Sequence, residues 1–130
     1  MIVVDASAVL EVLLRTPAAA SVEDRLFGSG ETLHAPHLID VEVAQVLRRY
    51  AASGEVDPER CRVALTDLID LPLTRYPHDF LLARAWELRH NLTAYDAVYV
   101  ALAEVLDAPL LTRDGRLSRA SEHRARIELV

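Results

Sequence analysis

The feature that most constrains this fold is the apolar segment at the beginning of the sequence. Residues 2–4 carry no polar side chain, and they run directly into Asp5. Branched apolar residues without a polar face predict a short strand that is buried on both faces, as in a parallel sheet. Asp5 would then lie where the strand ends and an apolar helix over residues 8–14 begins. Ligands of open parallel sheets bind at that edge, although Asp5 or Ser7 would equally serve as an ordinary N-cap.

Cap and turn residues divide the rest of the chain into alternating helices and strands. The pairs Thr16-Pro17 and Asp57-Pro58 would each open a helix, and Gly54 would end the most periodic one. This alternation predicts one α/β domain over residues 1–130, with a parallel sheet of about five strands and helices on both faces. The predicted helices after the first cover residues 17–28, 37–53, 58–71, 78–90 and 93–106; the predicted strands cover residues 33–35, 73–75, 109–112 and 126–130, with a turn at Asp114-Gly115.

Composition limits the possible classes of protein. Hydrophobic residues make up 52% of the chain, which excludes a disordered protein. The longest apolar run, residues 97–103, is too short to span a membrane, and we expect no secretory leader, because no basic segment precedes the apolar residues 2–4. The single cysteine, Cys61, forms no internal disulfide and fits a packing role in a cytoplasmic protein. The net charge of −6 argues against non-specific binding of nucleic acid. However, all 14 basic residues are arginines, and five fall in the last 18 residues: Arg113, Arg116, Arg119, Arg124 and Arg126.

Two further acids stand among apolar neighbours on predicted helices. Glu42 has Leu38 and Val46 at helical spacing, so it projects from an apolar stripe, where a salt bridge to an arginine or a position at the edge of the stripe is the ordinary explanation. Asp96 precedes the apolar residues 97–103 and would also complete a capping box with Thr93. A burial or cap role explains each acid when it is taken alone.

Asp114 completes a set of four acids. It follows the predicted strand 109–112, as Asp5 follows the first strand, although Asp-Gly is also a common turn. Four carboxylates that face one point would form an oxygen-only ligand set, which suits Mg²⁺ or Mn²⁺ and not zinc. The histidines complete no alternative metal site, and we interpret all of them as surface or capping residues: His34, His37, His78, His90 and His123.

The ordered motifs resemble those of a PIN-domain ribonuclease, and specifically a VapC-type toxin of a type II toxin–antitoxin system. The similarity covers essentially the whole chain, and four segments carry it: Val3-Val4-Asp5-Ala6-Ser7, Glu42 in the third helix, Tyr95-Asp96-Ala97, and Leu111-Thr112-Arg113-Asp114. It implies a PIN-like α/β fold in which Asp5, Glu42, Asp96 and Asp114 form the catalytic acidic quartet, supported by Ser7 and Thr112.

The resemblance also implies an activity and partners. We expect an Mg²⁺- or Mn²⁺-dependent endoribonuclease in which metal-activated water attacks a phosphodiester and leaves a 5′-phosphate and a 3′-hydroxyl. Asp5, Asp96 and Asp114 would bind the metal, Glu42 would bind it or orient water, and the C-terminal arginines would hold flanking phosphates. The expected partners are an RNA substrate, a cognate VapB-like antitoxin and a second copy of the chain, with no membrane involved.

Other functions remain open at this stage. A PIN nuclease could process RNA without a toxin role, and a PIN fold could serve only as an interaction scaffold. A haloacid-dehalogenase-like phosphatase would need an acid at position 7, where the chain has Ser7. A phospho-receiver signalling module would need a lysine near the site, and the chain has none.

Overall fold

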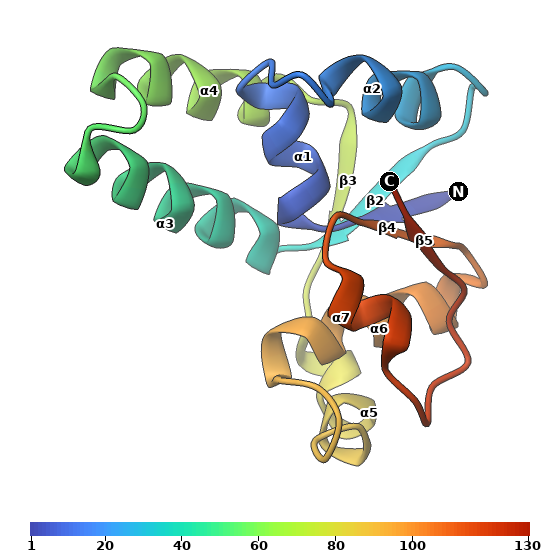
Figure 1. Ribbon diagram of the computed structural model, residues 1–130. Coiled ribbons are helices and arrows are strands. Elements are labelled where there is room, and N and C mark those ends of the chain that lie inside the picture. Colours follow the sequence, from blue (N-terminus) through green and yellow to red (C-terminus); the bar gives the residue numbers. More distant parts are fainter.

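A sheet of five parallel strands forms the centre of the molecule, as the sequence predicts. The computed structural model describes all 130 residues (Figure 1). The strand order is β3-β2-β1-β4-β5, so β1 occupies the middle, where neither face is open to solvent. The strands are β1 (Ile2–Val4), β2 (Leu33–Pro36), β3 (Leu73–Tyr76), β4 (Leu110–Thr112) and β5 (Ile127–Leu129).

Helices cover both faces of this sheet. The helices are α1 (Ala6–Leu13), α2 (Ala19–Phe27), α3 (Leu38–Ser53), α4 (Pro58–Asp70), α5 (Leu82–Glu87), α6 (Ala94–Leu106) and α7 (Gly115–Arg119), with a 3₁₀ turn η1 (Asp79–Leu81) before α5. In Figure 1 α1, α2 and α4 lie above the sheet, α3 extends to its left, and α5, α6 and α7 lie below it. Of the lower group, α6 packs directly against β1, β2 and β4.

Local capping signals predicted the ends of three helices correctly. Gly54 ends α3 with a φ of 80°, a left-handed conformation that glycine adopts without strain. The Asp57 carboxylate accepts a hydrogen bond from the Glu59 N–H at the start of α4, at 2.8 Å. The Thr93 hydroxyl caps α6 and accepts from the Asp96 N–H at 3.2 Å.

Three other boundaries differ from the prediction. The helix expected after Thr16-Pro17 begins only at Ala19, without a side-chain cap, because the Thr16 hydroxyl donates to Glu11 instead. The helix expected over residues 78–90 is divided into η1 and α5 and ends at Glu87, where the Leu88 N–H bonds to two carbonyls and tightens the last turn. Asp114-Gly115 is not a simple turn, because it opens α7.

The histidine prediction is wrong at two positions, because His34 is buried and both ring nitrogens of His123 are buried without a hydrogen-bond partner. His34 is buried in β2, because helices cover both faces of that strand. One ring nitrogen lies 2.7 Å from the Thr32 hydroxyl and the other 2.7 Å from the Tyr76 hydroxyl, so the ring is satisfied by hydrogen bonds within the fold. The interpretation of Cys61 is confirmed, since its side chain is buried in the core and forms no disulfide.

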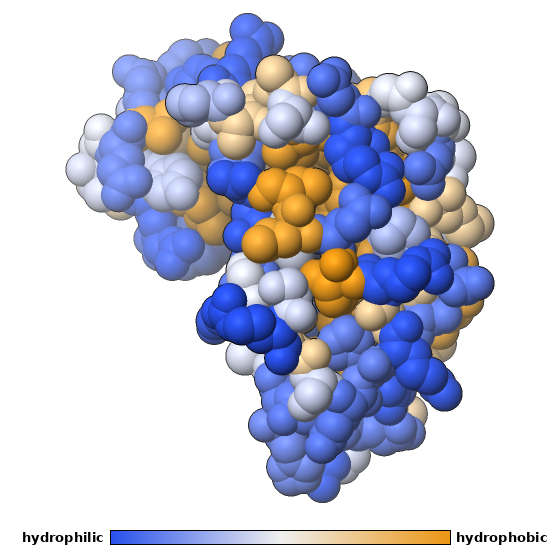
Figure 2. Space-filling view, turned by 45° about the vertical axis from the view of Figure 1, so that its right-hand side comes forward, coloured by the Kyte–Doolittle hydropathy of each residue, from blue (hydrophilic) through white to orange (hydrophobic).

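The surface is mostly hydrophilic. Figure 2 shows apolar atoms gathered in a band across the middle of one face, between a broad upper part and a narrower lower part. None of the helices has both the length and the apolar character needed to cross a membrane.

Candidate active site

The site lies where the chain reverses its direction of travel across the sheet. From β1 the chain winds outward through β2 to β3, and then returns to add β4 on the other side of β1. The carboxyl ends of β1 and β4 therefore lie side by side, and the Asp5 N–H bonds to the Leu111 carbonyl at 3.2 Å. A reversal of this kind opens a crevice at the strand ends, which is the usual place for ligands in open α/β sheets.

Three hydrogen bonds hold the Asp5 carboxylate at this crevice. Its Oδ1 accepts from the Ala8 N–H at 3.1 Å and from the Ser7 hydroxyl at 2.6 Å, and its Oδ2 accepts from the Thr112 hydroxyl at 2.5 Å. Asp5 is only 8% exposed. Burial raises the pKa of this carboxyl, the hydrogen bonds offset part of that rise, and the negative charge of Asp96 adds to it. Asp5 thus caps α1 and also presents a fixed carboxylate to the crevice.

Ser7 and Thr112 tie the two strand ends together. The Ser7 hydroxyl accepts from the Arg113 N–H at 2.9 Å, and the Thr112 hydroxyl accepts from the Asp114 N–H at 2.9 Å, while both hydroxyls donate to Asp5. Thr112 is completely buried. These two hydroxyls therefore hold the segment after β4 against the segment after β1.

Glu42 reaches the crevice from α3. Its carboxylate is half-buried and accepts a hydrogen bond from the Tyr99 hydroxyl on α6 at 2.6 Å. Burial is the main cause that raises the pKa of Glu42; the Tyr99 hydrogen bond opposes the rise, and the charges of Asp96 and Asp5 increase it. No arginine neutralises Glu42, so the salt bridge that would have explained its place on an apolar stripe is absent.

Tyr99 was not predicted as a site residue. Its side chain is 2% exposed, and a buried tyrosine hydroxyl normally needs a polar partner, which Glu42 supplies. Burial and the charge of Glu42 raise the pKa of the phenol far above its ordinary value, so Tyr99 remains a hydrogen-bond donor. Its position three residues after Asp96 on the same helix was the available sequence signal, but only the packing of α6 against α3 connects it to Glu42.

Asp96 and Asp114 differ in their electrostatic surroundings. Asp96 is half-buried, and its pKa is raised mainly by burial and then by the negative charge of Asp114. Asp114 caps α7, and its carboxylate accepts from the Arg116 N–H at 2.9 Å and from the Arg116 guanidinium at 2.7 Å. That hydrogen-bonded arginine lowers the pKa of Asp114. The two acids thus lie within electrostatic reach of each other and of Arg116, while only Asp114 forms an ion pair with that arginine.

All four acids line one cleft of about 680 Å³ between α1, α3 and the start of α6. The remaining polar lining consists of Ser7, Glu11, Gln45, Arg49, Tyr50, Tyr95, Tyr99 and Arg113. The carboxylates influence one another electrostatically, yet no three acids, histidines or cysteines lie close enough in this structure to form a ready-made metal centre. The donor set itself is all oxygen and negatively charged, which fits Mg²⁺ or Mn²⁺ in its chemistry. A cation would therefore be held by several of these carboxylates only after their side chains move closer together.

The C-terminal arginines do not act as one group. Arg113 lines the cleft, and Arg116 pairs with Asp114. Arg124 and Arg126 instead line a second cavity of about 470 Å³, where they face Glu104 and Asp107. The expectation that this basic segment as a whole holds phosphates is therefore wrong for Arg124 and Arg126, because acids outside the cleft already occupy them.

Comparison with known proteins supports this description. Residues 2–123 match the family model of the PIN domain. Ribonuclease VapC12 of Mycobacterium tuberculosis is 45% identical over 130 residues, which cover 100% of this chain and 99% of the relative.

Solved structures show the same fold. VapC20 of Mycobacterium tuberculosis, a sarcin-ricin loop cleaving toxin, superposes with a TM-score of 0.71 at 18% identity, covering 92% of this chain and 94% of that one. A chain of a toxin-antitoxin complex from Klebsiella pneumoniae superposes with a TM-score of 0.60 at 20% identity, covering 88% and 87%. At these identities the likeness concerns the fold alone.

Proposed function

The chain belongs to the PIN-domain family, and from that premise we propose that it is a VapC-type endoribonuclease that requires Mg²⁺ or Mn²⁺. One observation carries the proposal: four carboxylates from separate parts of the chain line a single cleft at the point where the sheet reverses direction. The full-length similarity to ribonuclease VapC12 supports RNA as the substrate. Family membership also excludes the phosphatase and receiver alternatives.

In this proposal Asp5 and Asp96 are the principal metal ligands, and Asp114 and Glu42 complete the site. Asp114 joins only when Arg116 releases it, and the Arg116 side chain is 76% exposed and free to move. When bound, the divalent cation would supply a Lewis acid that lowers the pKa of water and stabilises negative charge at the phosphodiester. Asp5 is already fixed by Ser7 and Thr112, so its carboxylate presents a defined geometry to the cation.

Glu42 has the role of handling the proton of the attacking water. Its raised pKa brings the carboxylate closer to the working pH, where a general base is most effective. The Tyr99 hydroxyl holds one carboxylate oxygen at 2.6 Å and so fixes the direction in which the other points. Cleavage of this kind leaves a 5′-phosphate and a 3′-hydroxyl.

The test compares two matched aspartate substitutions. Purified protein should cut transfer and ribosomal RNA with Mg²⁺ or Mn²⁺ and stop with EDTA. Asp5→Asn should lose at least about two orders of magnitude in rate, as expected when a charge that stabilises the transition state is removed. Asp107→Asn is the control, because that aspartate is 91% exposed and lies outside the cleft. Full activity of Asp5→Asn, or undiminished cleavage in EDTA, would refute the proposal.

The proposal includes a biological setting in the cytoplasm. The chain would act as a toxin that is neutralised by a cognate VapB-like antitoxin and would form a homodimer; the complex from Klebsiella pneumoniae with the same fold supports an antitoxin partner. A carboxylate-lined cleft is well suited to an inhibitory arginine. Co-expression with the neighbouring gene should rescue growth. If expression alone is harmless and no partner co-purifies, the alternative of an RNA-processing PIN nuclease without a toxin role is preferred.

A further inference from the structure

The cleft presents an electrostatic problem for an RNA substrate. Besides the four acids it contains Glu11, so these carboxylates repel the phosphates of an approaching RNA. A divalent cation would neutralise part of that charge at the scissile phosphate, but it would do nothing for the phosphates on either side. RNA-binding surfaces usually solve this problem with arginine, whose planar guanidinium matches a phosphate.

Two of the nearby arginines are already engaged by acids of the protein. Arg113 lies 3.5 Å from the Glu11 carboxylate, and Arg116 lies 2.7 Å from Asp114. Transferring the Arg113 guanidinium to a phosphate would leave the Glu11 carboxylate without its partner, and Arg116 does not line the cleft.

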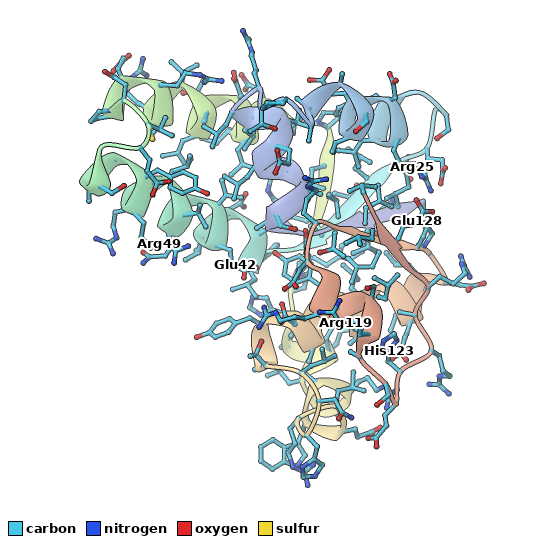
Figure 3. The ribbon with its side chains drawn as sticks, viewed as in Figure 1. Arg25, Glu42, Arg49, Arg119, His123 and Glu128 are labelled. Carbon is cyan, nitrogen blue, oxygen red and sulfur yellow. The ribbon has the colours of Figure 1, made fainter.

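Arg49 is different, because it lines the same cleft and has no partner. It is exposed, and it forms neither an ion pair nor a hydrogen bond with its side chain, whereas its neighbour Arg48 donates to Gln45 at 3.1 Å. Arg49 follows Glu42 by two helical turns of α3, which corresponds to about 10 Å along the helix axis. Figure 3 shows the two residues along the same lower edge of α3. The cleft thus has one unpaired guanidinium, and it lies on the same wall as a candidate catalytic acid.

We propose that Arg49 binds a phosphate of the RNA strand that flanks the scissile phosphate. The inference rests on the proposed ribonuclease function. It also assigns the path of the bound RNA strand, which would run along α3 from the four acids towards Arg49. Because Arg49 would contact the same phosphate before and during the reaction, its removal should raise KM and leave kcat nearly unchanged. A phosphate contact also contributes to salt dependence: each one adds about 0.7 to the slope of log affinity against log salt for single strands.

The experiment measures binding and cleavage separately. Binding of a fluorescein-labelled, mixed-sequence single-stranded RNA is measured by anisotropy in EDTA, between about 50 and 200 mM salt. The variants are Arg49→Gln, Arg49→Lys and, as the matched control, Arg48→Gln. Arg49→Gln should reduce the slope of log affinity against log salt by about 0.7. The ratio of wild-type affinity to variant affinity should then be about two- to threefold smaller at 200 mM salt than at 50 mM salt. Arg49→Lys should keep most of the slope, and Arg48→Gln should keep all of it.

The results separate this inference from the function on which it rests. If wild-type protein cleaves RNA with Mg²⁺ or Mn²⁺ but Arg49→Gln keeps the wild-type slope and KM, the Arg49 assignment is wrong and the nuclease function stands. If the wild type does not cleave at all, the proposed function fails. An Arg49→Gln variant that loses only its affinity for the co-expressed partner would also overturn the assignment, since Arg49 would then bind protein and not RNA.

Discussion

Glu104 on α6 should be one of the most important charged residues for stability. Its side chain is 8% exposed, and the Arg84 guanidinium donates to both of its oxygens, at 2.8 and 3.0 Å. The Arg124 N–H adds a third bond at 2.7 Å. Removing one partner of a fully buried ion pair costs about 3–5 kcal/mol. Because Arg84 is 26% exposed and glutamine keeps one acceptor, Glu104→Gln should cost about 2–3 kcal/mol.

This cost converts to a measurable shift in melting temperature. A chain of 130 residues has an unfolding entropy of about 270 cal/mol/K, so Glu104→Gln should lower Tm by about 7–11 °C in differential scanning calorimetry. The control is Glu87→Gln, which removes the other partner of Arg84 at a side chain that is 64% exposed and should lower Tm by about 2 °C at most. Equal Tm values for the two variants would refute the argument from burial.

The pH dependence gives a second check of the same pair. The hydrogen-bonded Arg84 lowers the pKa of Glu104 below that of the unfolded chain. A depressed carboxyl pKa stabilises the fold above the unfolded value of about 4.3, and this contribution disappears as pH falls through the folded value. The difference in Tm between wild type and Glu104→Gln should therefore be full near pH 7 and shrink below about pH 4. A difference that stays constant down to pH 3 would show that the charge of Glu104 contributes nothing.

Three further predictions concern the cleft. Tyr99→Phe should destabilise the fold by about 1 kcal/mol and shift the acid limb of the kcat/KM profile to higher pH, because the hydrogen bond that lowers the pKa of Glu42 is lost; an unchanged limb would contradict this. Thr112→Val should cost about 1–3 kcal/mol in urea unfolding and reduce cleavage, because a buried oxygen of Asp5 loses its donor. Asp96→Asn in EDTA at pH 7 should be more stable than wild type by about 1–2 kcal/mol and should melt at a higher temperature. The reason is that the folded pKa values of Asp5, Glu42 and Asp96 are raised. The contribution of these acids to stability is therefore full below about pH 4 and declines as pH rises through the folded pKa values. Added Mg²⁺ should narrow that gap, and a variant that melts with or below wild type would show that these charges do not repel one another.

Local sequence signals predicted those helix boundaries that depend only on hydrogen bonds between residues close together in the chain. Gly54 determines where α3 ends, and Asp57 and Thr93 determine where α4 and α6 begin. The capping geometry of these residues involves only neighbouring backbone. The start of α2 was wrong because Thr16 has a competing acceptor in Glu11, one turn back in the chain. The length of α5 was wrong because its last turn tightens at Leu88, whose N–H bonds to the carbonyls of both Arg84 and Ala85, and no cap residue in the sequence marks that point.

The site was predictable only as a set of acids. Asp5 and Asp114 cap helices and also line the cleft, so the local interpretation is confirmed and is compatible with the proposed function of these residues. Their sequence neighbours cannot separate the two roles, since a cap and a ligand require the same carboxylate. Tyr99 and Arg49 have roles that depend on which helices meet across the cleft, and no spacing within one helix reveals such a meeting.

The hydrogen bond between Thr112 and Asp5 joins residues 107 positions apart in the chain. During translation, the first strand leaves the ribosome long before β4, which is its neighbour in the sheet. Until β4 emerges, Asp5 lacks one of its donors, and the segment that carries Asp114 has not been synthesised. A nascent chain therefore remains without an assembled cleft for most of its synthesis. Pairing over such long separations is also slow compared with local folding, so an inhibitor that is made at the same time can reach the chain before its nuclease site is complete.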